Sequence, residues 1–265
     1  MSITERAYAK LNLALHVRGK LPDGRHRIET IFAFCEDGDE LTAEPFTIFG
    51  LASSGEFLSD LGEANLIVDA WRALEDEVGS PIGVQFTLDK RLPVASGIGG
   101  GSADAAAALR LMTRLCDLDP TLAAKVAPRL GADVPACLQS QNCRGDGAGD
   151  QLELIDLGLT DTPVLLVNPR IRLSTGAVFA AWDGVDRGPV GEWRDGRNDL
   201  ETPAIELVPE IANVLEWVRE QPGATFVRMS GSGATCFALF DNLTTRDAAI
   251  AACPPHWWHL GTRLR

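Results

Sequence analysis

The chain has 265 residues, which is enough to bury a hydrophobic core and to form one or two domains. Hydrophobic residues make up 45% of it and charged residues 23%, and no apolar run approaches the ~18 residues of a membrane-spanning helix, so we expect a water-soluble protein without membrane contact. The formal net charge of −13, from 24 basic and 37 acidic residues, has the wrong sign for binding nucleic acid through its phosphates.

The N-terminal segment and the cysteines bear on the compartment. Glu5 and Arg6 precede an alternating segment that lacks the apolar stretch and the small-residue cleavage site of a signal peptide. The six cysteines stand at wide, irregular spacings without a C-x-x-C pair, which argues against a metal knuckle and predicts reduced thiols. We therefore expect a cytoplasmic protein.

Strand-like patterns dominate the first fifty residues. Apolar residues occupy every odd position over residues 7–17, and this period of two predicts a half-buried strand with Lys10 and Asn12 on its polar face. The turn LPDGRH then leads to two further strand-like runs, over residues 28–35 and 41–49. An antiparallel start of this kind argues against a simple βαβ opening.

Later segments mix helical and strand-like patterns. Helical spacing runs over residues 66–78, and alternation over residues 82–88 leads into a glycine-rich loop. In the second half, strands are predicted over residues 151–157, 164–167, 235–240 and 260–264, and helices over residues 177–182, 205–218 and 245–252. We place a domain boundary near residue 157, which gives domains of residues 1–157 and 158–265.

The glycine-rich loop reads PVASGIGGGSA over residues 93–103 and precedes an Ala/Leu-rich helix predicted over residues 105–116, with Ser102 as its N-cap. Glycines allow successive backbone N–H groups and the start of a helix to point at one anion, so the pattern favours a phosphate site. The loop is neither a Walker A sequence nor a G-x-G-x-x-G fingerprint. A tight strand-to-helix turn without a ligand is the alternative.

The loop resembles the ATP loop of the small-molecule kinase superfamily that contains galactokinase, homoserine kinase, mevalonate kinase and phosphomevalonate kinase. Further segments resemble the members of that superfamily whose acceptor is a cytidine diphosphate sugar alcohol. In chain order they are AKLNLAL (9–15), DGRH (23–26), NLI (65–67), DKRLP (89–93), GADVP (131–135), NDLE (198–201) and GSGATCF (231–237). The resemblance spans nearly the whole chain.

The resemblance implies an α+β fold of two domains with the active site in the cleft between them. It also implies an ATP-dependent kinase that phosphorylates the 2-hydroxyl of 4-diphosphocytidyl-2-C-methyl-D-erythritol, in the non-mevalonate route to isoprenoid and terpenoid precursors. Two alternatives stay open: a kinase of the same superfamily that acts on homoserine or a mevalonate derivative, and a non-catalytic nucleotide-binding sensor. The only expected partner is the small-molecule substrate, bound by a monomer or a homodimer.

Two residues carry the chemistry that the resemblance implies. Phosphoryl transfer needs a carboxylate to accept the proton of the attacking hydroxyl, with a cation nearby. The resemblance assigns these roles to Asp133 and Lys10. Taken alone, Asp133 also fits a loop or helix-cap aspartate, and Lys10 a solvated lysine on an edge strand. The presence of both residues speaks against the sensor.

For the nucleotide, the resemblance assigns eleven loop residues to the ATP phosphates: Pro93, Val94, Ala95, Ser96, Gly97, Ile98, Gly99, Gly100, Gly101, Ser102 and Ala103. It places Asn65 and Lys90 near the adenine or the phosphates, although Asn65 also fits a helix cap and Lys90 a charge at a strand end. Mg²⁺ is expected with ATP, with Ser102 as its hydroxyl ligand. Asp104 fits either a place near the metal or a favourable position in the helix dipole.

For the acceptor, the resemblance implies a cytosine ring held between aromatic side chains, with its edge bound by His26 of the DGRH turn. The family pattern has a tyrosine at position 25, where this chain has Arg25, whose planar guanidinium can also stack on a base. Phe179 matches the other aromatic partner, and Thr175 and Asn12 complete the expected acceptor site. Taken alone, Phe179 and Thr175 also fit core or cap positions of a helix that begins near Ser174.

Overall fold

The computed structural model describes residues 1–62 and 65–265. In these residues the strands are β1 (Ile3–Lys20), β2 (His26–Pro45), β3 (Gly50–Ser54), β4 (Val84–Asp89), β5 (Cys143–Asp146), β6 (Gln151–Leu154), β7 (Pro163–Asn168), β8 (Ala224–Met229), β9 (Cys236–Phe240) and β10 (Trp258–Arg263). The α-helices are α1 (Leu66–Val78), α2 (Gly100–Leu115), α3 (Pro120–Leu130), α4 (Val134–Gln139), α5 (Thr175–Ala181), α6 (Glu201–Leu207), α7 (Glu210–Arg219) and α8 (Leu243–Ala252). None of the helices so described has both the length and the apolar character needed to cross a membrane.

The chain forms two compact units. The first consists of Met1–Ala9, Asp37–Val94 and Gly99–Ser140, and the second of Lys10–Glu36, Ala95–Ile98 and Gln141–Arg265. Strands β1 and β2 and the glycine-rich loop therefore contribute residues to both units. The boundary near residue 157 stays a prediction.

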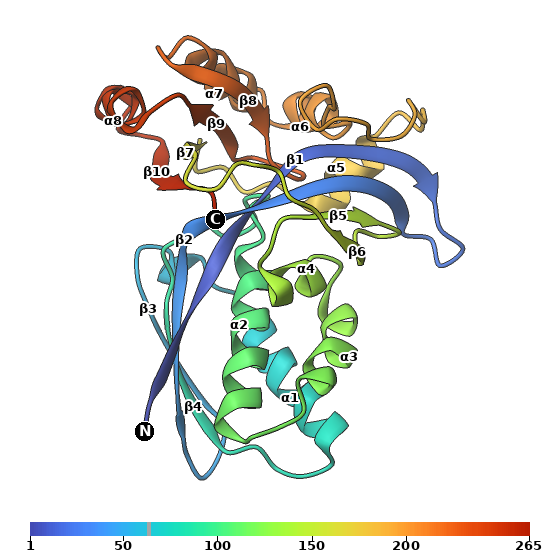
Figure 1. Cartoon of the computed structure of the whole chain (residues 1–265), viewed down its shortest axis with the longest axis vertical. Helices are drawn as coiled ribbons and strands as arrows, with labels where there is room; N and C mark the ends of the chain where they lie inside the picture. Colours follow the sequence, from blue (N-terminus) through green and yellow to red (C-terminus); the bar gives the residue numbers. More distant parts are fainter. Residues whose placement is uncertain (63–64) are drawn as a thin grey trace. The chain divides into compact units, whose positions relative to one another are not determined.

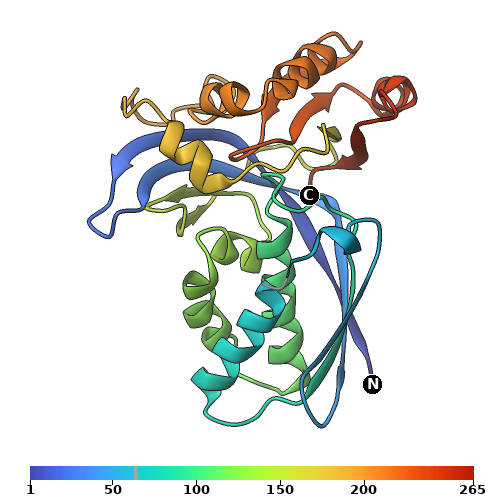
Figure 2. The ribbon, with the colours of Figure 1, turned by 180° about the vertical axis from the view of Figure 1, so that it is seen from behind.

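In the first unit, four helices pack beside a small sheet. Strand β4 pairs antiparallel with the C-terminal part of β2 and parallel with β3. Helices α1, α2, α3 and α4 lie on one side of these strands, and the view from behind shows the same arrangement (Figures 1 and 2). Helix α2 contacts α1, α3 and α4, because its buried alanine run over residues 105–108 allows close approach. The sheet and α2 thus determine where the glycine-rich loop begins and ends.

The second unit contains a separate antiparallel sheet in the order β10-β7-β9-β8. Helix α7 packs on β8 and β9, and α8 packs on β7 and β10. The core between these layers includes Val167, Ile211, Val214 and Phe240. In the same unit the N-terminal part of β2 pairs with β5, and β5 pairs with β6. Mixed helices and strands in both units confirm the α+β class.

Two sequence predictions about strands were wrong. The runs over residues 28–35 and 41–49 do not form two strands, because β2 is continuous from His26 to Pro45. The strand predicted to be half-buried is covered on its polar face, where Lys10 is 2% and Asn12 1% exposed. The cause lies within the second unit, where the loop residue Ile98 and Ser230 bond to the backbone of β1.

Predictions about helices were more accurate. Helix α1 has the predicted bounds, from Leu66 to Val78. The helix predicted over residues 205–218 is interrupted, because α6 ends at Leu207 and Pro209 is the N-cap of α7. Proline is compatible with a helix start but not with its interior, so it divides the predicted segment.

Candidate active site

The glycine-rich loop takes backbone conformations that favour glycine. Gly97 has a φ of 79° and Gly99 a φ of 70°, both in the left-handed region. A Cβ atom at Gly97 would lie 2.3 Å from the carbonyl oxygen of Ser230 and 2.8 Å from the amide nitrogen of Gly233. Position 97 therefore requires glycine both for its backbone angle and for the close approach of the 230–233 turn.

Within the second unit, three successive carbonyl groups of the loop accept hydrogen bonds from other segments of the same unit. Thr235 N donates to Ser96 O at 3.1 Å, Ser230 Oγ to Gly97 O at 3.0 Å, and Lys10 N to Ile98 O at 2.9 Å. A trans peptide unit points its N–H away from its carbonyl. The amides of residues 97–99 therefore point away from these donors, as a loop that offers N–H groups to an anion requires.

Helix α2 begins earlier than predicted, and Ser102 is not its N-cap. The helix starts at Gly100, and its N-cap is Gly99, which has no side chain to cap the first turn. Ser102 lies in the first turn and is half-buried. The first amides of a helix have no intrahelical partner, so this end combines N–H donors with the positive end of the helix dipole.

A buried trio of charged side chains lies beside this helix start. Lys90 Nζ donates to Asp39 Oδ2 at 2.5 Å and to Asp104 Oδ2 at 2.7 Å, and none of the three residues is more than 4% exposed. Burial lowers the pKa of Lys90, but the two carboxylates outweigh burial and the net shift is upward. Burial raises the pKa of Asp104 to about 7, and its Oδ1 has no hydrogen-bond partner among the described residues.

Lys10 and Asn12 form a hydrogen-bonded network in the second unit. Lys10 Nζ donates to Asn12 Oδ1 at 2.9 Å, and Asn12 Nδ2 donates to Thr30 Oγ1 at 2.8 Å. The Thr30 hydroxyl in turn donates to the carbonyl of Ala14 at 2.6 Å. This chain of donors fixes the orientation of the Asn12 amide, with its oxygen toward the ammonium. The Lys10 ammonium also lies 5.4 Å from the centre of the Phe32 ring.

Asp133 and Asn65 both stand at helix N-termini of the first unit. Asp133 is the N-cap residue of α4, but its side chain makes no capping hydrogen bond, and it is half-buried. Asn65 is the N-cap of α1, and its Oδ1 accepts from Ile67 N at 2.9 Å. The capping interpretation of Asn65 is therefore confirmed, while the nucleotide contact of Asn65 and the role of Asp133 as a base stay predictions.

The structure brings together His26 and Phe179 of the predicted acceptor site. Their rings stack with centroids 4.8 Å apart and planes 24° apart, and Trp182 meets His26 edge-on at 5.7 Å and 88°. Burial lowers the pKa of His26, and the positive charge of Lys20 lowers it further. Sequence reasoning missed Trp182, the C-cap residue that follows the last residue of α5.

The remaining predicted acceptor residues lie in the same unit with other partners. Thr175, the first residue of α5, has its hydroxyl 2.9 Å from that of Ser232. The Arg25 guanidinium is half-exposed and pairs with Asp23 at 2.8 Å and Asp150 at 3.6 Å. The contacts described for Arg25 are thus with carboxylates, and the structure does not group it with the three rings.

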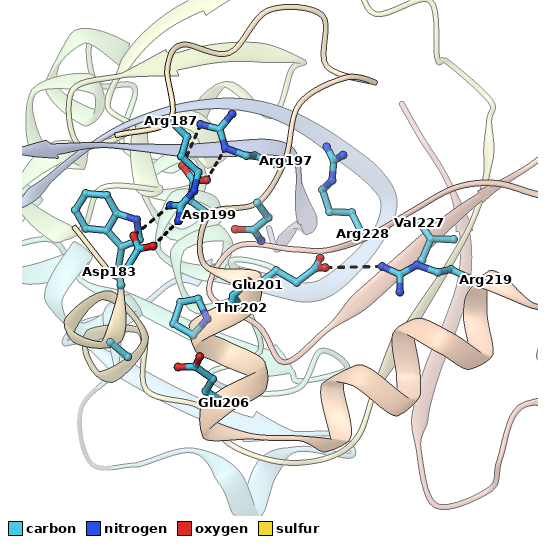
Figure 3. A pocket seen from close by; sticks show the side chains of 14 residues that line it. Asp183, Arg187, Arg197, Asp199, Glu201, Thr202, Glu206, Arg219, Val227 and Arg228 are labelled. Atoms are coloured by element: carbon cyan, nitrogen blue, oxygen red, sulfur yellow. Dashed lines mark hydrogen bonds and ion pairs between the residues drawn. The ribbon is translucent and has the colours of Figure 1, made fainter. Parts of the chain in front are cut away.

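A cavity of about 460 Å³ lies beside α5 and α6 in the second unit (Figure 3). Trp182 is among its lining residues, so the cavity adjoins the ring cluster. Three of its guanidinium groups pair with carboxylates of the same cavity: Arg187 with Asp183, Arg197 with Asp199 at 2.6 Å, and Arg219 with Glu201 at 3.8 Å. These pairs compensate most of the charge in the cavity. The sequence analysis did not predict this cavity.

Comparison with known proteins shows the family. The description "GHMP kinases N terminal domain" matches residues 65–141, and "GHMP kinases C terminal" matches residues 186–258. The 4-diphosphocytidyl-2-C-methyl-D-erythritol kinase of Novosphingobium aromaticivorans is 53% identical over 100% of this chain and 94% of its own. The same kinase of Rhizorhabdus wittichii is 52% identical over 100% of this chain and 96% of its own.

Solved structures agree with these matches. A crystal structure of 4-(cytidine 5'-diphospho)-2C-methyl-D-erythritol kinase has a TM-score of 0.82 at 32% identity and covers 99% of each chain. Homoserine kinase from Cytophaga hutchinsonii has a TM-score of 0.69 at 15% identity, over 99% of this chain and 95% of its own, and shares the fold alone. The chain belongs to the GHMP kinases and, among them, to the family of 4-diphosphocytidyl-2-C-methyl-D-erythritol kinases.

Proposed function

We propose that the chain transfers the terminal phosphoryl group of ATP to the 2-hydroxyl of 4-diphosphocytidyl-2-C-methyl-D-erythritol, giving ADP and the 2-phosphate in the non-mevalonate isoprenoid route. Family membership over the full length supports the reaction and the acceptor. The observation that carries the proposal is the glycine-rich loop, whose carbonyls over residues 96–98 are bonded to the protein while the amides over residues 97–99 point the other way.

On the nucleotide side, the loop of residues 93–103 would hold the ATP phosphates through its backbone N–H groups, which begin after Pro93, and Asn65 would lie near the adenine or the phosphates. The residues present fit a phosphate group, because the start of α2 carries no side-chain cap. Within residues 1–62 and 65–265, no group of three or more His, Cys, Asp and Glu side chains is arranged to hold a metal ion. Following the resemblance, Ser102 would contribute a hydroxyl to Mg²⁺, with phosphate oxygens among the other ligands; the bound ion would neutralise phosphate charge.

On the acceptor side, His26 and Phe179 would bind the cytosine ring, with Arg25, Thr175 and Asn12 completing the site. Support comes from the ring stacking of His26 on Phe179 and from the order that the Asn12 network imposes. A neutral His26 ring, favoured by its lowered pKa, can both donate and accept hydrogen bonds at a base edge.

For the chemical step, Asp133 would accept the proton of the attacking hydroxyl, and Lys10 would stabilise the negative charge of the reacting group. Both roles match what phosphoryl transfer requires of a protein, namely a proton acceptor and a fixed cation. The side chain of Asp133 is not used to cap its own helix, and Lys10 is oriented by Asn12.

The two alternatives have less support. The homoserine kinase and mevalonate kinase structures that share this fold are 9–16% identical to the chain, which carries no argument about substrate. A sensor without catalysis would not need both Lys10 and Asp133.

ADP release measured with four acceptors tests the proposal. We expect turnover with the cytidine diphosphate compound and little with methylerythritol phosphate, homoserine or mevalonate. Equal rates with and without the cytidine would contradict the acceptor assignment, and ATP binding without turnover on any alcohol would favour the sensor.

A further inference from the structure

Three buried charges meet at the base of the glycine-rich loop, and they come from separate parts of the first unit. Asp39 lies on β2, Lys90 directly follows β4, and Asp104 lies on α2; they are 0%, 2% and 4% exposed. Lys90 is 51 residues from Asp39 and 14 from Asp104 along the chain. Charged groups are rarely buried to this extent unless they are paired, so the burial of each member of the trio depends on the other members.

Asp39 fixes the segment that enters the loop. Its Oδ1 accepts the backbone amides of Arg91 at 2.6 Å and Leu92 at 2.8 Å, while its Oδ2 accepts Lys90 Nζ at 2.5 Å. Three consecutive residues, 90–92, are therefore bonded to one carboxylate. These residues immediately precede Pro93, the first residue of the loop.

Lys90 connects the segment of residues 90–92 to α2, the helix that follows the loop. The ammonium donates to Asp104 Oδ2 at 2.7 Å, near the start of α2. A Cβ atom at Gly100 would lie 3.1 Å from Lys90 Nζ and 3.6 Å from Asp39 Oδ2, so the trio lies directly beside the first residue of α2. Both flanks of the loop thus meet the same three charges.

We propose that Asp39, Lys90 and Asp104 form a clamp that holds the two flanks of the glycine-rich loop in position, and that Lys90 is a positioning residue acting on ATP through the loop rather than a group that contacts ATP. The inference rests on the proposed assignment of residues 93–103 to the nucleotide phosphates. Three of the four carboxylate oxygens in the trio are engaged in fixing the flanks.

The use of charge here, rather than apolar packing, fits a positioning role. A buried ion cluster contributes little net stability compared with apolar residues of similar size, because desolvation offsets the attraction between the charges. Its hydrogen bonds are directional, however, so they specify one arrangement of the backbone that they join. An anion site made of backbone amides depends on that arrangement.

The variant Asp104→Asn distinguishes a clamp that acts through the loop from a direct contact of Lys90 with ATP. It keeps the positive charge of Lys90 and leaves Asp39 as the carboxylate of the trio that balances it. The clamp predicts that affinity for a fluorescent ATP analogue, measured without acceptor, falls at least about tenfold. Hydrogen exchange of the amides over residues 99–103 should become faster, while kcat at saturating ATP stays within about threefold of wild type. A direct contact of Lys90 with ATP predicts unchanged affinity and exchange in this variant.

Asp39→Asn is the second variant, since it also keeps the Lys90 charge, and Lys125→Met is the matched control. Lys125 forms an ion pair with Glu77 in the same unit, but its side chain is 68% exposed, so we expect no change in ATP binding. Wild-type affinity in both Asn variants would overturn the clamp, as would failure of both to fold, because the trio would then serve folding alone. If ATP does not protect residues 93–103 from exchange in the wild type, the loop assignment of the proposed function fails instead.

Discussion

Two lysines of this chain are equally buried, at 2% exposure, but their surroundings differ. Lys90, in the first unit, is bonded to the carboxylates of Asp39 and Asp104. Lys10, in the second unit, donates to the neutral amide oxygen of Asn12 and lies against the Phe32 ring. The hydrogen bonds described for Lys90 join it to two carboxylates, whereas the hydrogen bond described for Lys10 joins it to a neutral amide that orients the ammonium.

The comparison teaches that burial alone does not tell a structural lysine from a catalytic one. An ammonium surrounded by carboxylates is suited to joining segments of backbone, because its charge is already balanced. An ammonium held in a fixed orientation, as Asn12 holds that of Lys10, can stabilise negative charge that develops on a substrate. We therefore expect substitution of Lys90 to affect stability and loop position first, and substitution of Lys10 to affect turnover first.

Lys90→Met should have the largest effect on stability. It leaves two carboxylates buried without their cation, so we expect the free energy of unfolding to fall by about 3–5 kcal/mol. Urea denaturation at neutral pH measures this change. Lys125→Met, which removes an exposed ion pair of the same unit, should stay within about 0.5 kcal/mol of wild type. Equal losses in the two variants would remove the contrast between buried and exposed pairs.

Lys10→Met should have the largest effect on turnover. Removing one oriented cation from a developing charge is expected to lower kcat about 10²–10³-fold, while binding of the ATP analogue changes little. Steady-state kinetics with the cytidine diphosphate acceptor measures the change. Lys125→Met is the control, because it removes an exposed lysine that is assigned to neither binding site. If Lys10→Met lowers ATP affinity more than it lowers kcat, the proposed division between the two lysines is wrong.

Local patterns in the sequence predicted part of this site correctly. Helix α1 followed from apolar periodicity, and the glycine run marked the loop because glycine is the residue that tolerates left-handed backbone. The α+β class followed from the resemblance. The motif resemblance directed attention to His26 and Phe179, which the structure places in contact. Helix α1 and the glycine run depend on residues close together in the chain, whereas the pairing of His26 with Phe179 joins distant residues and followed from the resemblance alone.

The features of the site that were not predicted depend mostly on residues that are distant in the chain. Apolar periodicity does not encode which segments cover a strand. Two segments distant in the chain cover β1, where Ile98 O accepts from Lys10 N and Ser230 Oγ accepts from Asn12 N. Asp39 carries no local sign that it will bond to Lys90, 51 residues away. The start of α2 was misplaced because Ser102 is a good N-cap residue, yet Gly99 takes the left-handed conformation that ends the loop.

Phe179→Ala tests the ring cluster of His26, Phe179 and Trp182 in the second unit. Stacking of a base on an aromatic side chain is worth about 1–3 kcal/mol, so the KM for the acceptor should rise at least about fivefold while the KM for ATP stays constant. Trp257→Ala is the control, since Trp257 pairs with Trp217 and is not among the rings that contact His26. An unchanged acceptor KM in Phe179→Ala would remove Phe179 from the acceptor site.

Asn65, in the first unit, caps α1 and is also proposed to lie near the nucleotide, and substitutions can separate these two roles. Asn65→Ala should lower the free energy of unfolding by about 1 kcal/mol, because it removes the cap of α1. Asn65→Ser keeps a capping oxygen, so it should restore stability but not the KM for ATP. Asn242→Ala removes the equivalent cap of α8 in the second unit and should leave that KM unchanged. Restoration of both quantities by Ser would assign Asn65 to capping alone.

His26 gives the smallest expected effect and tests whether the ring cluster favours an uncharged histidine. Its pKa in the folded chain is lowered, first by burial and then by the charge of Lys20. A group with a lowered pKa on folding contributes stability that is present above its unfolded pKa of about 6.5 and is lost as the pH falls through the folded value. Wild type should therefore lose more stability than His26→Gln between neutral and mildly acidic pH.

The difference between the two proteins isolates His26 from the other histidines. Burial also lowers the pKa of His16, but His16 is present in both proteins and cancels in the comparison. An NMR titration of the His26 ring gives the direct measurement, and Lys20→Met should move its pKa upward by removing the nearby charge. A His26 pKa at or above 6.5 in the wild type would show that the ring cluster does not exclude the charged form, and the proposed neutral contact with the base edge would lose its support.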